Sequence, residues 1–99
     1  MDTIPLSYAN FLILWVLQTP SHGYEIMKNI TEKTKKNVTI GPATIYRSLS
    51  YYQENGYIDL ISEMDNKKKY KLTASGKELL NKQIEFLTLL YDMTEQERK

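Results

Sequence analysis

Residues 42–58, PATIYRSLSYYQENGYI, decide the fold, because they contain the signals for a complete helix and for the start of a strand. Proline suits the first position of a helix, where it has no N–H to lose and already has a helical φ. Apolar residues then recur at i, i+4 and i+7, which predicts a buried face of Ile45, Leu49 and Tyr52. Asn55–Gly56 ends the helix, since glycine readily adopts the left-handed conformation found just past a helix C-terminus.

The opposite face of this helix is free to contact a partner. At about 100° per residue it consists of Ala43, Arg47, Ser50 and Glu54, flanked by Thr44, Tyr46 and Tyr51. Arg47 is its one basic residue, and arginine can bind guanine O6 and N7 with two hydrogen bonds. The alternative is that Arg47 is an ordinary surface residue and that Thr44 and Tyr46 pack at the edge of the core.

Two further helices are expected before this stretch. The first spans 6–17, with Ser7 as its N-cap and Thr19–Pro20 after its end. Its run 11–17 is apolar on every side, so a partner subunit is expected to cover part of it. Ser21 is expected to cap the second helix, which frays through 31–37.

A hairpin should follow, with strands at 57–63 and 69–72 around a turn at 64–67. A lysine run, Lys67 to Lys69, lies at its tip. Lysines there suit contact with phosphates, which is independent of sequence and sensitive to salt. The alternative is a solvated turn.

Thr73 is expected to cap a last helix from Ala74 to the low nineties, with a frayed tail at 94–99. It carries one stripe at coiled-coil spacing, Leu80, Ile84, Leu87 and Tyr91, and a second stripe, Leu79, Phe86, Leu90 and Met93. Two stripes on one helix predict two partners, the helix's own domain and a neighbouring chain.

Composition excludes several classes of protein. The 99 residues fit one domain, and with no cysteine and one histidine the chain offers no thiolate or multi-histidine metal site. We find no nucleophile–base pair, paired carboxylates or glycine-rich phosphate loop, so we expect neither an enzyme nor a cofactor. The N-terminus lacks the basic flank of a signal peptide and 11–17 is too short to span a bilayer, so we expect a cytoplasmic protein without a membrane partner.

The charge distribution favours a nucleic-acid partner more than the net charge does. The whole chain carries only +1, but residues 20–72 hold nine basic and six acidic residues, a net charge of +3. The order of the expected elements predicts a mainly α fold with a minor β part. This is a winged helix-turn-helix with a two-stranded β wing and a long C-terminal dimerisation helix. Residues 1–73 would bind DNA and 74–99 would form the dimerisation helix of the same single domain.

Three motifs resemble the PadR-like transcriptional regulators, over roughly 9–80. PSHGYEI at 20–26 is similar to the start of the family's second helix. PATIY at 42–46, followed by Leu49 and by ENGYI at 54–58, is similar to its recognition helix, although Ala43 and Arg47 depart from the usual glycine and proline. KYKLT at 69–73 with Gly76 is similar to the return strand of its wing.

This resemblance implies a homodimeric repressor on a pseudo-palindromic DNA operator, released by a small aromatic or hydrophobic effector. The residues expected to contact DNA are His22, Tyr24, Pro42, Ala43, Thr44, Tyr46, Arg47, Lys67, Lys68 and Lys69. Those expected in the dimer interface are Phe11, Trp15, Leu80, Ile84, Leu87 and Tyr91. Trp15 is alternatively a core residue or a wall of a ligand site, and His22 is alternatively a capping residue, which we favour over a pH sensor. The competing function is a winged-helix protein-interaction module that does not bind DNA.

Overall fold

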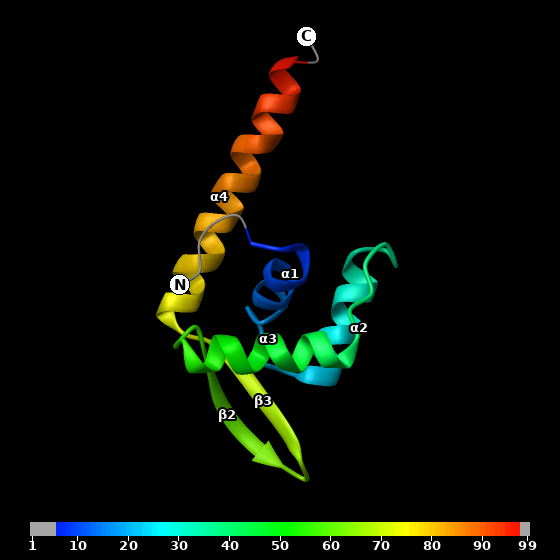
Figure 1. Cartoon of the computed structure of the whole chain (residues 1–99), viewed down its shortest axis with the longest axis vertical. Coiled ribbons are helices and arrows are strands. Elements are labelled where there is room, and N and C mark those ends of the chain that lie inside the picture. Colours follow the sequence, from blue (N-terminus) through cyan, green and yellow to red (C-terminus); the bar gives the residue numbers. More distant parts are fainter. Residues whose placement is uncertain (1–5, 98–99) are drawn as a thin grey trace.

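The computed structural model describes residues 6–97, which form four helices and three strands (Figure 1). In chain order these are α1 (Tyr8–Val16), β1 (Ser21–His22), α2 (Gly23–Lys33), α3 (Pro42–Glu54), β2 (Ile58–Met64), β3 (Lys67–Leu72) and α4 (Ala74–Glu97). The fold is mainly helical with a small antiparallel sheet, which confirms the predicted winged helix-turn-helix with its long C-terminal helix.

Helix α3 is confirmed in detail. Its predicted core residues Ile45, Leu49 and Tyr52 are at most 1% exposed, and Pro42 occupies the first turn. At the other end, Gly56 has a φ of 79°, and the N–H groups of Gly56 and Tyr57 donate to the carbonyls of Gln53 and Tyr52. This is a Schellman motif, which satisfies the last carbonyls of the helix and turns the chain toward β2.

The predicted hairpin is also confirmed, and a third strand joins it. β2 and β3 pair antiparallel around Asp65 and Asn66, whose φ angles of 53° and 65° fit a two-residue hairpin turn. The turn is therefore shorter than expected, and Lys67 already belongs to β3. The pairing register of β2 with β3 shifts between Leu60 and Ser62. β1 pairs with the other edge of β3, so the sheet order is β1-β3-β2.

The start of α2 differs from the prediction because of this extra strand. Ser21 is not the N-cap: it lies in β1 opposite Tyr70, and its hydroxyl donates to the carbonyl of Thr19. His22 is the N-cap instead, and Glu25 completes a capping box with it. Ser7 does cap α1, as expected, by accepting from the N–H of Asn10.

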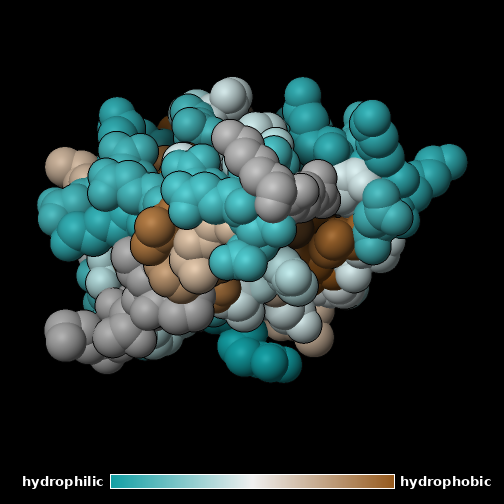
Figure 2. All heavy atoms as spheres, turned by 90° about the horizontal axis from the view of Figure 1, so that it is seen from above, coloured by the Kyte–Doolittle hydropathy of each residue, from teal (hydrophilic) through white to brown (hydrophobic). Residues whose placement is uncertain are grey.

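Helix α4 extends beyond the folded body and is longer than predicted. Thr73 accepts from the N–H of Gly76, as expected for its cap, but the helix continues to Glu97, where a frayed tail was expected. Figure 1 shows the far half of α4 standing clear of the other elements. The radius of gyration is 14.5 Å, against about 13 Å for a compact chain of 100 residues. Seen from the end toward which α4 points, apolar patches lie among hydrophilic side chains (Figure 2).

Candidate nucleic-acid interface

Helix α3 and the β2–β3 wing lie together at one end of the molecule, opposite the free end of α4 (Figure 1). On α3, Ala43, Tyr46, Arg47 and Ser50 are exposed and Thr44 is half-buried, so the face predicted to be open is open. No ion pair within residues 6–97 engages Arg47. Its guanidinium is therefore available to a partner.

Tyr46 lies across the start of α2, and the absence of a side chain at Gly23 makes this possible. A Cβ added to Gly23 would lie 2.8 Å from Cε1 and 2.9 Å from the hydroxyl oxygen of Tyr46. Tyr46 remains 51% exposed. The close approach therefore holds the tyrosine against α2 while leaving its outer surface open.

His22 and Glu25 form a polar pair beside Tyr24. One oxygen of Glu25, Oε1, lies 2.8 Å from the backbone N–H nitrogen of His22 and 2.9 Å from its Nδ1. The hydrogen bond from the backbone N–H of His22, and then that from its side chain, lower the pKa of the Glu25 carboxyl below 4.5. His22 thus has the capping role that was the alternative to DNA contact, although a capping residue can still lie beside a phosphate.

The wing lysines are divided between two environments. Lys67 and Lys68 are exposed and line a cleft between the wing and α3. Lys69 is half-buried, because it lies in the centre of the sheet, opposite His22 on one side and Ser62 on the other. The three predicted residues are therefore close in sequence but do not line the same surface.

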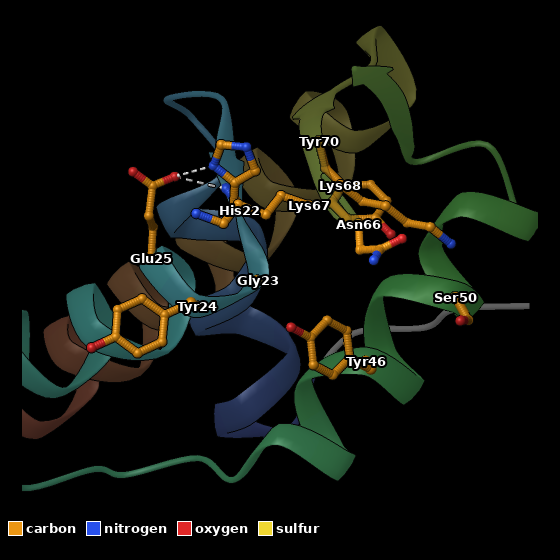
Figure 3. Close-up of a pocket in the computed structure, with 10 residues that line it drawn as sticks. All are labelled: His22, Gly23, Tyr24, Glu25, Tyr46, Ser50, Asn66, Lys67, Lys68 and Tyr70. Atoms are coloured by element: carbon orange, nitrogen blue, oxygen red, sulfur yellow. Dashed lines mark hydrogen bonds and ion pairs between the residues drawn. The ribbon is translucent and has the colours of Figure 1, made fainter. Parts of the chain in front are cut away.

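The cleft has a volume of about 730 Å³ and brings together residues from four elements (Figure 3). Its lining consists of His22, Gly23, Tyr24, Glu25, Tyr46, Ser50, Asn66, Lys67, Lys68 and Tyr70. Five of the predicted DNA-contact residues are among them: His22, Tyr24, Tyr46, Lys67 and Lys68. Tyr24 and Pro42 also line a second groove of about 440 Å³ between α2 and residues 39–42.

Tyr70 is the cleft residue that the sequence did not reveal as functional. Its place on the inner face of the hairpin predicted a core residue, and it is indeed only 5% exposed. The same side chain nevertheless lines the cleft (Figure 3). Burial raises the pKa of its hydroxyl above 10, and the neighbouring Tyr46 and Glu63 raise it further, so the hydroxyl is protonated at neutral pH. A period-two pattern alone does not signal such a residue.

The residues expected in a dimer interface differ in exposure. Leu80 is 2% exposed and packs in the core of its own chain, so it has little area to offer a partner. Ile84, Leu87 and Tyr91 are 37%, 38% and 63% exposed. Phe11 and Trp15 of α1 are partly buried against the core. The outer part of the stripe on α4 is therefore the open part.

We also searched residues 6–97 for a metal site and for a membrane-spanning helix. No group of three histidine or acidic side chains lies close enough together there to hold a metal ion. None of the helices in this part of the chain combines the length and apolarity needed to cross a membrane.

Known proteins are similar to this chain in both sequence and fold. Residues 13–82 match the Transcriptional regulator PadR-like family. The chain is 36% identical over 70 residues to transcriptional regulator YqjI of Escherichia coli K12, covering 71% of this chain and 34% of that protein. It therefore spans about a third of the length of this curated relative.

Solved structures extend the likeness to the whole fold. A transcriptional regulator from Clostridium thermocellum, 28% identical, has a TM-score of 0.78 over 90% of this chain and 88% of that chain. Bacillus subtilis PadR, solved in complex with operator DNA, is 23% identical and has a TM-score of 0.71 over 92% of this chain and 61% of that chain.

Proposed function

Because the chain belongs to the PadR-like family of transcriptional regulators, we propose that it binds a double-stranded DNA operator as a homodimer and represses transcription. One observation carries the proposal: the exposed face of α3, with Arg47, lies at the same end of the molecule as the lysine-bearing wing. A helix and a wing in this arrangement can occupy a groove and the adjoining backbone at the same time.

The proposed contacts have separate tasks. Arg47 and Thr44 of α3 would read base edges, because α3 is the element that fits the major groove. His22, Tyr24, Pro42, Ala43, Tyr46 and the wing lysines would contact the backbone. Contacts of this kind fix the position of a protein on the duplex without reading its sequence. A repressor acts at the chromosome, so we expect the protein in the cytoplasm.

The proposed homodimer rests on the apolar surface of α4 and α1. An exposed stripe on α4, which the rest of residues 6–97 leaves uncovered, consists of Ile84, Leu87 and Tyr91. A second copy related by a two-fold axis would cover this stripe and the outer side of α1. It would also place two α3 helices about 34–36 Å apart, which matches successive major grooves of a pseudo-palindromic site.

The proposal also includes a small aromatic effector that binds at the dimer seam. Trp15 lies on α1 and is half-buried against the core. At a dimer seam, an indole ring can stack against a flat apolar ligand. Such a ligand would release DNA only by binding the two dimer geometries with different affinity.

The test is fluorescence anisotropy of the purified protein on the DNA upstream of its own gene. We expect submicromolar binding there and much weaker binding to a scrambled duplex of equal length. Arg47→Ala should narrow this difference by about tenfold, since a two-hydrogen-bond contact to a base contributes about 1–3 kcal/mol of discrimination. Lys77→Ala, which removes an exposed cation on α4, is the matched control. It should leave the affinity for the upstream DNA and for the scrambled duplex unchanged.

A protein-interaction module without DNA binding is the second candidate. The near-neutral net charge of +1 and the single cation on the outer face of α3 favour it. Equal and weak binding to specific and scrambled DNA, unaffected by Arg47→Ala, would support this function and contradict repression.

A further inference from the structure

Tyr70 is a buried residue in the wall of the cleft, and it carries a polar hydroxyl. Tyr70 is 5% exposed, and no residue among 6–97 forms a hydrogen bond with this hydroxyl. Burying a hydroxyl without a hydrogen bond costs free energy, so such groups in native proteins call for an explanation. Phenylalanine would fill the same space at no such cost. The hydroxyl is therefore better explained by a ligand than by packing.

The surroundings of Tyr70 fit an anionic ligand. Lys67 and Lys68 line the same cleft, and Tyr46 adds a second phenol whose hydroxyl has no hydrogen-bond partner among the described residues. Figure 3 shows Tyr46 below Tyr70 and the two lysines, with Glu25 on the far side of His22. The Oε1 atom of Glu25 is already bound to His22, on the side of His22 away from the lysines.

We propose that this cleft is the site of one phosphate of the DNA backbone, and that the Tyr70 hydroxyl donates a hydrogen bond to it. The inference rests on the proposed function, which places α3 in the major groove and the wing beside the backbone. Tyr46, held by its close approach to Gly23, is the second donor. Lys67 and Lys68 neutralise the charge.

The occupant is a DNA backbone rather than a free anion for two reasons. The cleft is bounded by α3 and the wing, the two elements proposed to contact DNA, so a duplex on α3 brings a strand to its mouth. Its volume of about 730 Å³ also exceeds what a single phosphate group fills, and is sufficient for the neighbouring sugars.

The first experiment compares Tyr70→Phe with the wild type in DNA anisotropy titrations and thermal unfolding. We expect the affinity to fall about tenfold, because a hydrogen bond to a charged group is lost. The slope of affinity against salt should not change, because a neutral donor releases no counterion. The unfolding midpoint should stay the same or rise, whereas a purely structural hydroxyl would lower it. Tyr57→Phe, at the other end of the hairpin, is the matched control and should leave affinity unchanged.

The second experiment scans the operator with single methylphosphonates, which remove the charge of one phosphate at a time. Several positions in each half-site should weaken the wild type, and at one of them Tyr70→Phe should lose little more. Should Tyr70→Phe not fold, Tyr46→Phe takes its place in the same scan.

The results separate this inference from the proposed function. Wild-type affinity in Tyr70→Phe, or equal sensitivity of both proteins at every phosphate, overturns the phosphate site while repression stands. Competition by millimolar inorganic phosphate that Tyr70→Phe abolishes, without any change in its DNA affinity, would assign the cleft to a free anion instead. Absence of DNA binding by the wild type would overturn both.

Discussion

Single residues position the proposed DNA-binding groups, and Gly23 is the clearest case. In Gly23→Ala the new methyl group would overlap the far end of the Tyr46 ring. The ring is exposed and can move away, so folding stability should change little while the hydroxyl leaves the cleft. We expect DNA affinity to fall about tenfold, because the hydrogen bond from the Tyr46 hydroxyl to the charged phosphate is lost. A double-mutant cycle measures this: in a Tyr46→Ala background, Gly23→Ala should have no further effect. An equal loss in both backgrounds would show that Gly23 acts by another route.

Glu25 makes the start of α2 sensitive to acid. Its folded pKa lies below 4.5, chiefly because it accepts the backbone N–H of His22. The carboxylate therefore contributes its full stability above pH 4.5, and this contribution is lost as pH falls through the folded pKa. Urea unfolding between pH 7 and pH 3 should show a smaller acid-induced loss of stability for Glu25→Gln than for the wild type. Equal acid-induced losses of stability in Glu25→Gln and the wild type would contradict the capping role of the charge.

At the scale of elements, α4 packs closely at Gly76 against the backbone of Tyr57, which directly precedes β2. A side chain there would overlap the carbonyl oxygen of Tyr57, a backbone atom that cannot move aside. We expect Gly76→Ala to lower the free energy of unfolding by about 3 kcal/mol, the upper range for overpacking. Gly41→Ala is the matched control, because nothing lies within 4 Å of its added methyl group, and it should change stability by less than about 0.5 kcal/mol. Urea denaturation measures the free energy of unfolding of each variant. Equal losses of this free energy in Gly76→Ala and Gly41→Ala would contradict this packing.

The elements also show which structure is predictable from sequence. Helix α3 was predictable because its proline start, its apolar spacing and its glycine end are all local signals. Strand β1 was not, because two residues become a strand only through pairing with β3, which follows 45 residues later. The same holds for Ser21 and His22, whose roles depend on that pairing.

The candidate site was predictable only in part, for a related reason. The residues on α3 and the lysine run follow from helix periodicity and charge. Tyr70 does not, because its side chain belongs both to the core and to a cleft that exists only when the wing lies against α3. Leu80 shows the converse: its spacing matched the stripe on α4, but the body of the domain covers that end of the helix.

At the scale of the whole molecule, the uncovered stripe on α4 makes oligomeric state the relevant property. Leu87→Lys should shift the protein from dimer to monomer in sedimentation-velocity experiments, because it places a charge in a surface that a second copy would bury. Asn81→Lys introduces the same charge at an exposed hydrophilic position of α4 and should remain dimeric. A wild-type protein that sediments as a monomer at all concentrations would contradict the proposed homodimer.

DNA binding through the wing is tested most directly by its salt dependence. Each lysine that neutralises a phosphate adds about 0.9 to the slope of log affinity against log salt concentration. Anisotropy titrations from low to physiological salt should show a steep slope for the wild type on the DNA upstream of its gene. The variant with Lys67, Lys68 and Lys69 all replaced by alanine should bind more weakly, with a slope smaller by at least about 2. The same slope and affinity in both proteins would contradict a DNA-binding wing.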